Sequence, residues 1–385
     1  MINTFKMTNK ISLLFSIAIL IFAPQAFSQD TGTQRDFGTI TTAVPFLMIG
    51  PDARAGGMGD LGVATSPDGN SIYWNASKLA FIEDDMGYTI SYVPWLKGLV
   101  DDIGLGYVSF YKKMGDEQTV GGSLRYFSLG NITFTNEEGI SLGTYKPNEW
   151  VIDMAYARKL SDNFSAAVTG KFIYSNLTLG QNINGVDSRA GTSVAADVSM
   201  FYTNLIQIGR TDVKLNMGLA INNIGNKISY TSSTQKDFIP TNLRFGFGGE
   251  FELDSYNTLS ITGELTKLLV PTPPVRDEEG NPISPYLDNN VSTIAGMLHS
   301  FYDSPFGEEM QEINFAGGVE YWYDKQFAVR GGYFYESAQK GNRQYFTLGA
   351  GLKYNVFGLD FSYLISTNPN NPLKNTLRFT LAYDM

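Results

Sequence analysis

Several residue types are scarce or missing in this 385-residue sequence, and each absence excludes a class of protein. There is no cysteine, which excludes disulfide bonds, thiolate metal sites and cysteine nucleophiles. The single histidine, His299, excludes a metal site built from several histidines. Charged residues make up 17%, below the usual level of about 25%, and the net charge of -10 argues against binding to nucleic-acid phosphates.

Long apolar runs are also scarce, and the clearest one, residues 11–23, lies near the N-terminus. Lys6 and Lys10 accompany it, and Ala26 and Ser28 supply small residues at the -3 and -1 positions of a cleavage site. This order is typical of a secretory signal peptide, and the run is too short to cross about 30 Å of bilayer as a helix. We therefore expect residues 1–28 to be removed near Ser28, leaving a mature chain without a transmembrane helix.

Aromatic residues and glycine are abundant instead, at 14% and 40 residues. From Met86 onward, apolar residues recur at every second position, which is the period of a β-strand. In residues 240–253, for example, Phe245 and Phe247 alternate with Arg244 and glycine. Fourteen such segments start near residues 86, 103, 118, 149, 163, 189, 212, 240, 256, 310, 326, 342, 356 and 374.

The connections between these segments broadly alternate between long and short, although 205–211 is of moderate length. Residues 130–148 and 271–309 are long, whereas 161–162 and 324–325 are tight turns. Outer-membrane barrels show this asymmetry, with short periplasmic turns and long outer loops. Because a bilayer leaves an open strand edge unpaired, the sheet must close. The sequence thus predicts an all-β fold, a 14-stranded antiparallel transmembrane β-barrel over 86–385. A soluble β-sandwich or β-helix is the alternative.

The alternation also predicts which way side chains point. The apolar face should contact lipid, and aromatic residues near strand ends should form interfacial girdles, for example Trp95, Trp150, Tyr321 and Tyr323. The opposite face should line the lumen. Its charged residues should pair with one another or meet water, namely Arg125, Arg244, Glu250, Glu264, Glu320, Arg330 and Arg378.

Residues 29–85, which precede the barrel, do not alternate. They contain the small-residue run 53–59 and the aromatic stretch 72–81. A barrel of eight strands is already filled by side chains, so fourteen strands enclose more space. We expect this segment to fold into the lumen as a hatch, with a disordered periplasmic tail as the alternative. Residues 57–62 match a dinucleotide-binding fingerprint by letter, but no parallel α/β pattern surrounds them, which favours close backbone packing by glycine.

The runs 54–64 and 73–80 resemble the hatch of FadL-type outer-membrane channels. In that family the second run normally reads Asn-Pro-Ala-x-Leu-Ala, whereas Ala76 and Ser77 stand here for the proline and the alanine. When the segment 45–54 and the chain length are considered together with these runs, the whole mature chain most resembles the PorV family of the type IX secretion system. The resemblance implies a fourteen-stranded barrel and these candidate hatch residues: Arg54, Gly57, Gly59, Trp74, Asn75 and Leu79.

The same resemblance implies partners. Members of the family associate with a large outer-membrane translocon barrel and receive secreted cargo through its C-terminal signal domain. They pass the cargo to a cell-surface attachment complex that contains a sortase-like protease. In gliding bacteria the same pathway exports adhesins. Membrane lipid is a further expected partner, whereas a nucleic acid and a cofactor are not expected.

Residues 271–309 are the best candidate for a partner-binding loop. They hold seven acids against one base, Arg276, together with several aromatic residues. Aromatic residues among charges are common in recognition surfaces. The alternative is a loop whose acids only keep the surface solvated. The candidate residues are Asp277, Glu278, Glu279, Tyr286, Phe301, Tyr302 and Phe306.

Enzymatic chemistry is not expected, because no Ser-His-Asp arrangement and no calcium-loop spacing is present. The first of three functional hypotheses is a type IX secretion component that binds and delivers cargo. The second is a FadL-like transporter of hydrophobic small molecules, which needs an apolar pocket beside the hatch and a kinked strand, for which Gly121 and Gly122 are candidates. The third is an outer-membrane enzyme acting on lipid, which needs clustered acids facing the outer leaflet.

Overall fold

The computed structural model describes residues 39–385, except 98–99, 101, 136–138, 181, 184–185, 210, 232–235, 278–281, 285 and 369–370. The expected signal peptide therefore lies outside the described residues. In the part of the chain that the structure describes, no helix has both the length and the apolar character needed to cross a membrane.

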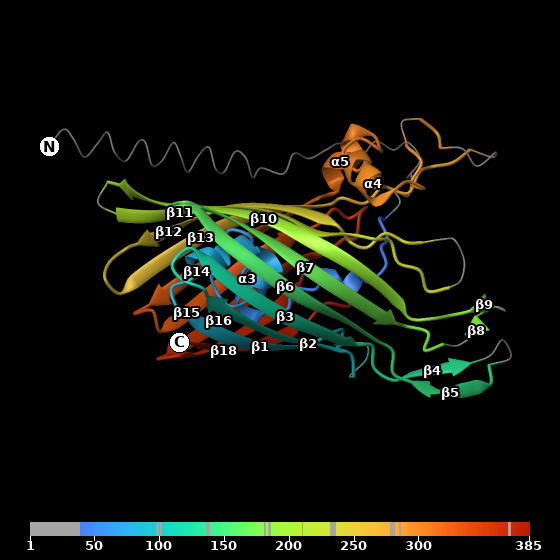
Figure 1. Cartoon of the computed structure of the whole chain (residues 1–385), viewed down its shortest axis with the longest axis horizontal. Helices are drawn as coiled ribbons and strands as arrows, with labels where there is room; N and C mark the ends of the chain where they lie inside the picture. Colours follow the sequence, from blue (N-terminus) through green and yellow to red (C-terminus); the bar gives the residue numbers. More distant parts are fainter. Residues whose placement is uncertain are drawn as a thin grey trace. The chain divides into compact units, whose positions relative to one another are not determined.

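Fourteen antiparallel strands of the described chain form one closed barrel (Figure 1). Each pairs with the next barrel strand along the chain, and the first pairs with the last, so the sheet has no free edge. They are β1 (Met86–Pro94), β2 (Gly104–Lys113), β3 (Gln118–Ser128), β6 (Asn148–Ser161), β7 (Phe164–Asn176), β10 (Gly191–Ile208), β11 (Thr211–Gly225), β12 (Asn242–Glu252), β13 (Asn257–Leu268), β14 (Ile313–Tyr323), β15 (Phe327–Tyr335), β16 (Gln344–Tyr354), β17 (Phe357–Ser366) and β18 (Leu377–Asp384). The predicted barrel is confirmed, and each strand starts within three residues of its expected position.

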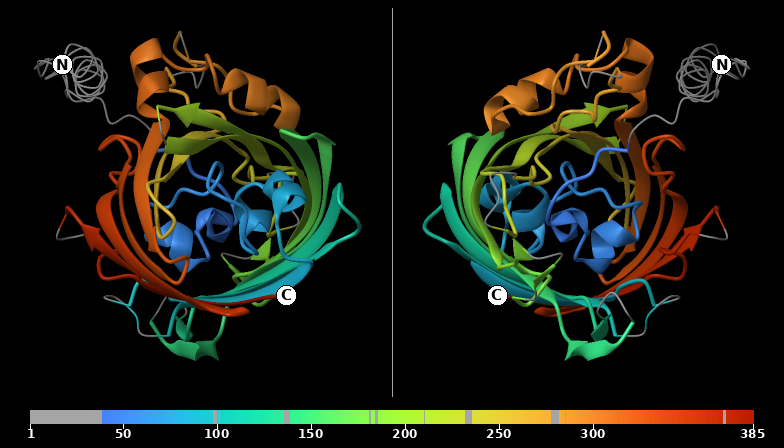
Figure 2. Two further views of the ribbon diagram at one scale, coloured as in Figure 1. Left: turned by 90° about the vertical axis from the view of Figure 1, so that its left-hand side faces the viewer. Right: turned by 90° about the vertical axis from the view of Figure 1, so that its right-hand side faces the viewer.

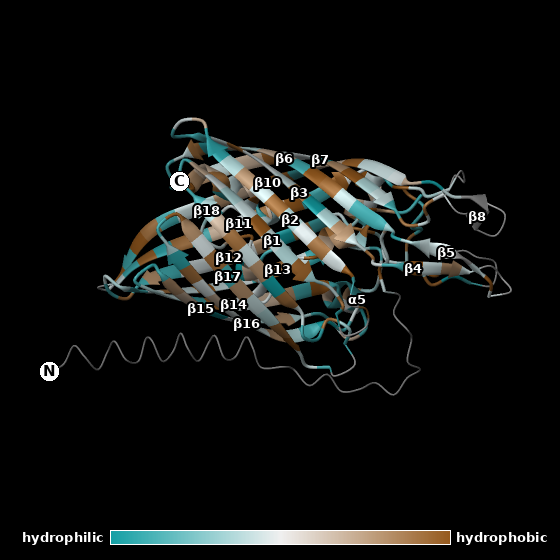
Figure 3. Cartoon of the chain, turned by 90° about the horizontal axis from the view of Figure 1, so that it is seen from below, coloured by the Kyte–Doolittle hydropathy of each residue, from teal (hydrophilic) through white to brown (hydrophobic). Residues whose placement is uncertain are grey.

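Side chains alternate between the two faces of the barrel as predicted. In β1, Tyr88, Ile90 and Tyr92 are exposed, whereas Thr89 and Ser91 between them are buried. Figure 3 shows hydrophobic and hydrophilic residues taking turns along the strands. Because lipid cannot hydrogen-bond to a protein, the exposed apolar face is the one that contacts the bilayer.

Connections at the two ends of the barrel differ in length. One end, here called the turn end, has the connections 114–117, 162–163, 209–210, 253–256, 324–326 and 355–356. The other, the loop end, has 95–103, 129–147, 177–190, 226–241, 269–312, 336–343 and 367–376. The expected moderate connection at 205–211 is a tight turn, because β10 extends to Ile208 and β11 starts at Thr211.

The long loops contain structure that the strand period did not reveal. Loop 129–147 forms a hairpin of β4 (Ile132–Thr135) and β5 (Ser141–Tyr145), and loop 177–190 pairs β8 (Asn182–Ile183) with β9 (Val186–Asp187). Loop 269–312 contains two short helices, α4 (Thr293–His299) and α5 (Phe306–Gln311). Figure 1 shows α4 and α5 close together near the loop end.

The segment before β1 lies inside the barrel. It contains four short helical turns, η1 (Pro45–Met48), α2 (Ala53–Gly56), α3 (Ser71–Trp74) and η2 (Ala76–Phe81). Viewed from either end of the barrel, this blue segment occupies the lumen (Figure 2). Most of its side chains are buried, so it fills the space that fourteen strands enclose. We refer to residues 44–82 as the hatch.

A charge on the lipid face of β6 tests this arrangement. Met154 is 61% exposed in the middle of the strand, and Leu160 is 60% exposed on the same face near the turn end. Arginine costs about 2–4 kcal/mol at the bilayer midplane and about 0–1 kcal/mol near an interface. We expect Met154→Arg to lose stability on that scale and Leu160→Arg to lose much less, measured by guanidinium unfolding in lipid vesicles. Equal losses would contradict the placement of β6.

Candidate functional site

The hatch backbone lies directly against glycine residues of the barrel wall. A Cβ atom on Gly332 would overlap the backbone of Met58, and one on Gly218 would overlap the Val63 carbonyl group. On the hatch side, Gly59 has a φ of +82°, and its own Cβ would meet the Tyr333 backbone. Only glycine permits such an approach, and a positive φ also favours it. The glycine-rich run therefore serves close packing of backbone against backbone.

Charged wall residues bind the hatch, beginning with Glu320 on β14. Arg54 of the hatch donates hydrogen bonds to Glu320 from Nε at 3.0 Å and from Nη2 at 2.7 Å. Arg330 on β15 donates to the same carboxylate from Nε at 2.6 Å. Arg54 also donates from Nη1 to Asp68, a second hatch residue, at 2.9 Å. A carboxylate that is buried between two guanidinium groups is well compensated, and removal of either partner is costly.

Two further contacts repeat this arrangement at other points of the wall. Glu264 on β13 accepts hydrogen bonds from the Gly62 amide and from Arg244, each at 2.8 Å. Asp60 of the hatch accepts a hydrogen bond from Arg378 on β18. The wall thus holds the hatch by ion pairs and hydrogen bonds on several sides, which opposes its displacement.

The remaining candidate hatch residues make contacts within the lumen. Trp74 donates from Nε1 to Asp52 at 2.7 Å, and Asn75 donates from Nδ2 to the Val63 carbonyl group at 2.9 Å. The Asn75 side chain also accepts a hydrogen bond from the Ser77 amide and so caps η2. Leu79 is fully buried.

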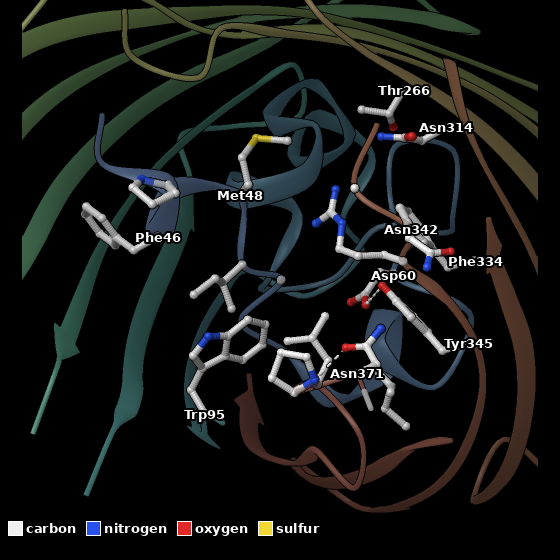
Figure 4. Close-up of a pocket in the computed structure, with 18 of the residues that line it drawn as sticks. Phe46, Met48, Asp60, Trp95, Thr266, Asn314, Phe334, Asn342, Tyr345 and Asn371 are labelled. Atoms are coloured by element: carbon white, nitrogen blue, oxygen red, sulfur yellow. Dashed lines mark hydrogen bonds between the residues drawn. The ribbon is translucent and has the colours of Figure 1, made fainter. Parts of the chain in front are cut away.

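An outer cavity of about 540 Å³ lies between the hatch and the loop end of the barrel. Figure 4 shows Phe46 and Met48 of the hatch, Trp95 of loop 95–103 and Asn342 of loop 336–343 around it. The expected position of Trp95 in an interfacial girdle is therefore wrong, because its ring lines this cavity. A second cavity, of about 300 Å³, lies at the turn end and shares no lining residue with the first.

The strand kink that a lateral transport route needs is not found at the predicted place. Strand β3 pairs in continuous register with β2 and β6 through Gly121 and Gly122. The pairing of β10 with β11 shifts instead, between Ala196 and Val198. The Gly121–Gly122 prediction is therefore corrected.

The acids of loop 269–312 are not uniformly exposed. Glu308 and Glu309 of α5 and Glu312, which directly follows the helix, are buried. Lys340 donates to Glu308 at 2.6 Å, and Lys267 donates to Glu309 at 2.9 Å and to Glu312 at 2.6 Å. These lysines were missed because they lie outside the loop in the sequence. One signal in the sequence could have indicated Lys267, because it directly precedes the loop near the end of a strand.

Of the candidate loop residues, Tyr286 also proves to be buried, at 8% exposure, because its hydroxyl donates to Glu308 at 2.8 Å. Asp277 is exposed, and Glu278 and Glu279 lie outside the described residues. Phe301, Tyr302 and Phe306 are exposed, Phe306 at 79%. Together with Ile294, Leu298 and Met310 they are the exposed large apolar side chains of α4, α5 and the residues between these helices, and we call this set the α4–α5 face.

A closed barrel with a lipid-facing apolar wall and a luminal hatch defines an outer-membrane β-barrel protein. Among solved structures, the chain is similar to the toluene transporter TodX of P. putida, with 10% identity and a TM-score of 0.48 over 88% of this chain and 98% of that one. It is also similar to a Pseudomonas aeruginosa FadL homologue, with 11% identity and a TM-score of 0.44 over 90% and 99% of the two chains.

A model of the family described as type IX secretion system protein PorV matches residues 32–275. The chain belongs to the PorV family, and it is an outer-membrane component of the type IX secretion system. No curated protein sequence matches it significantly. In an outer-membrane barrel the turn end faces the periplasm, so the loop end faces the cell exterior.

Substitutions at two neighbouring glycines test the close packing of the hatch against the barrel wall. Gly332→Ala places a methyl group against the Met58 backbone, and such overpacking costs about 1–3 kcal/mol. Gly331→Ala is the control, because its nearest neighbour is the Thr347 carbonyl oxygen at 4.0 Å, and it should change stability by less than about 0.5 kcal/mol. We expect only Gly332→Ala to lower the thermal unfolding temperature and to raise ion conductance in planar bilayers. Two silent variants would contradict the close packing.

The buried carboxyl group of Asp303 predicts a pH dependence of loop docking. Burial raises the pKa of Asp303 to about 7, from 3.8 in the unfolded chain. Between these two pKa values, Asp303 keeps its proton when the loop is docked and loses it when the loop is undocked. The free energy of docking therefore becomes less favourable as the pH rises from about 3.8 to about 7, and it is constant at higher pH. We expect hydrogen exchange in residues 286–312, corrected for the intrinsic rate, to be faster at about pH 8 than at about pH 5.

Asp303→Asn cannot ionise and should remove this difference. Its side-chain oxygen can still accept the hydrogen bond that Asp303 takes from the Thr272 amide. Asp324→Asn, in a short turn at the opposite end, is the control and should behave as the wild type. A pH dependence that persists in Asp303→Asn would assign the effect to another group.

Proposed function

We propose that this protein is a cargo carrier of the outer membrane. It binds secreted cargo through the C-terminal signal domain of the cargo at the translocon barrel, and it delivers the cargo to the attachment complex with the sortase-like protease. The observation that carries the proposal is the contrast between a blocked lumen and an apolar, helical surface at the outer end. Membership of a secretion family supports the same assignment.

The blocked lumen argues for binding rather than conduction. The hatch is held by Glu320, Glu264 and Arg378 of the wall and by glycine contacts, and most of it is buried. A folded or extended cargo protein has no route through such a lumen. This protein therefore acts on cargo that crosses the membrane elsewhere, which requires surfaces for the cargo and for the barrel through which it crosses.

The α4–α5 face is the surface that we assign to the translocon. Its six apolar side chains are exposed, while Glu308 and Glu309 of α5 are buried and pair with Lys340 of loop 336–343 and Lys267 of β13. These pairs fix α5 before any partner binds, which lowers the entropy cost of association. Exposed aromatic residues such as Phe306 are typical anchors of protein interfaces.

The outer cavity favours a second candidate, a FadL-like transporter of hydrophobic small molecules. Its aromatic residues Phe46, Trp95 and Phe127 suit an apolar ligand. The regular pairing of β3 and the separate cavity at the turn end do not support a route across the membrane. We therefore rank transport below cargo binding.

A triple variant tests the proposed surface. Phe301→Ser, Tyr302→Ser and Phe306→Ser together remove three apolar anchors, and hot-spot residues cost about 2 kcal/mol or more each when truncated. We expect at least a tenfold loss of translocon recovered in a mild-detergent pull-down from native membranes, together with reduced cargo export. Tyr256→Ser, which removes an exposed tyrosine in a turn-end connection, is the control and should retain both. Unchanged recovery in the triple variant would reject this assignment.

A further inference from the structure

The second cavity, at the turn end, faces the periplasm. Its volume of about 300 Å³ lies at the lower limit of the usual range for ligand sites, roughly 300–1,000 Å³. Its walls come from residues 66–70 and 81–84 and from strands on opposite sides of the barrel, such as β1 and β12. Glu83 and Lys325 of its lining are exposed. Because the turns around it are short, the cavity suits a small ligand better than a protein partner.

Arg330 of β15 offers this cavity a free hydrogen-bond donor. The residue is only 4% exposed, and it donates from Nε to Glu320 and from Nη1 to Asp360, each at 2.6 Å. Its Nη2 atom is buried and has no hydrogen-bond partner among the described residues. The network that joins Arg330 and Arg54 holds three carboxylates, the third from Asp68, against two guanidinium groups. The free donor therefore fits a neutral acceptor, such as an amide carbonyl or a hydroxyl group, better than a further anion.

An aromatic surface lies beside this donor. Trp322 of β14 lines the same cavity, and its ring centroid is 5.4 Å from the guanidinium carbon of Arg330. Phe81 of the hatch adds a second aromatic ring to the lining. The apolar face of a sugar ring can pack on an indole ring, which removes apolar area from water. An acetamido group on such a sugar carries the carbonyl oxygen that Nη2 can bind. The donor and the ring together point to an N-acetylated amino sugar.

Charges of both signs complete the lining. Lys214 of β11 lies opposite Glu250 of β12 in the strand register, and both line the cavity. Lys353 lies 4.0 Å from Asp84, and these two side chains are 43% and 42% exposed. Ion pairs as exposed as the second one contribute little, so their groups exchange readily for the charges of a ligand. A ligand that carries carboxylates and an ammonium group finds partners for both.

We propose that the turn-end cavity binds a fragment of peptidoglycan, namely an N-acetylated sugar with its attached peptide. The sugar packs against Trp322, and its acetamido oxygen accepts a hydrogen bond from Arg330. The carboxylates and the amine of the peptide pair with lysines and acids of the lining, such as Lys214 and Glu250. Peptidoglycan is the periplasmic polymer that joins these two chemistries. The site fastens the barrel to the cell wall, and it does not rest on the proposed carrier function, which uses the opposite end of the barrel.

Calorimetry on the full-length protein in lipid nanodiscs tests the inference. The probes are the disaccharide-tetrapeptide released from peptidoglycan, the free tetrapeptide, and chitobiose, which has N-acetylated sugars and no charge. Because only the first probe makes both sets of contacts, it should bind about tenfold or more tightly than either of the others. Lys214→Gln should weaken the disaccharide-tetrapeptide by about two- to fivefold and leave chitobiose unchanged.

A matched pair of glycine substitutions tests the place of binding. A Cβ atom on Gly358, which lines the cavity, would meet only the Ala382 Cβ at 3.4 Å, so Gly358→Phe can fill the cavity without moving the backbone. Gly170 lies on the lipid face of β7, and its Cβ would meet nothing within 4 Å. We expect Gly358→Phe to lose binding about tenfold or more, because overpacking costs about 1–3 kcal/mol, and Gly170→Phe to bind as the wild type. A tryptophan fluorescence change on binding that Trp322→Phe removes gives a second readout, which needs no filled cavity.

Four results would overturn the inference. Binding of none of the probes removes the site, and a free tetrapeptide that binds as tightly as the disaccharide-tetrapeptide makes it a peptide site. No effect of Lys214→Gln on the disaccharide-tetrapeptide removes the charged half of the recognition. Binding that persists in folded Gly358→Phe, with a fluorescence change that persists in Trp322→Phe, places the ligand elsewhere. The pull-down of the translocon reports separately on the carrier function, which stands or falls without this site.

Discussion

The bilayer's inability to hydrogen-bond to a protein is the constraint on which the rest of this structure depends. It forces the sheet to close, so that β1 pairs with β18, and it places apolar side chains on the outer face. Closure of fourteen strands leaves a lumen that wall side chains alone do not fill. The hatch fills it, and the glycine residues of the wall let its backbone approach the strands more closely than side chains would permit.

Burial explains why the carboxylates of the lumen and of the outer loop are paired with basic groups. A carboxylate removed from water needs compensation, and Glu320 obtains it from Arg54 and Arg330. Glu308 obtains it from Lys340 in the same way, in a loop rather than in the lumen. In both places buried ion pairs help to hold a segment that lies outside the sheet. The apolar side chains of the α4–α5 face therefore lie on a segment whose own acids are buried and paired.

Local patterns in the sequence predicted the barrel well and its sites poorly. The strand period is a property of neighbouring residues, so all fourteen starting points were recovered from the alternation. The burial of Tyr286 depends on Glu308, and Glu308 depends on Lys340, which follows it only after β14 and β15. Trp95 looked like an interfacial residue because nothing local distinguishes an inward ring from an outward one at a strand end. Such contacts are set by tertiary packing, which a single sequence does not encode in any local pattern.

The asymmetry of the two ends connects the fold with secretion. At the turn end the strands are joined by minimal connections, which leave little surface for a partner. At the loop end the chain adds hairpins, helices and a cavity, and α5 is held there by Lys267 of β13 and Lys340 of loop 336–343. Since the hatch separates the two ends, binding at the outer end needs no opening of the barrel. The proposed carrier function makes use of this arrangement, since it requires a partner surface at the outer end and no passage of cargo through the lumen.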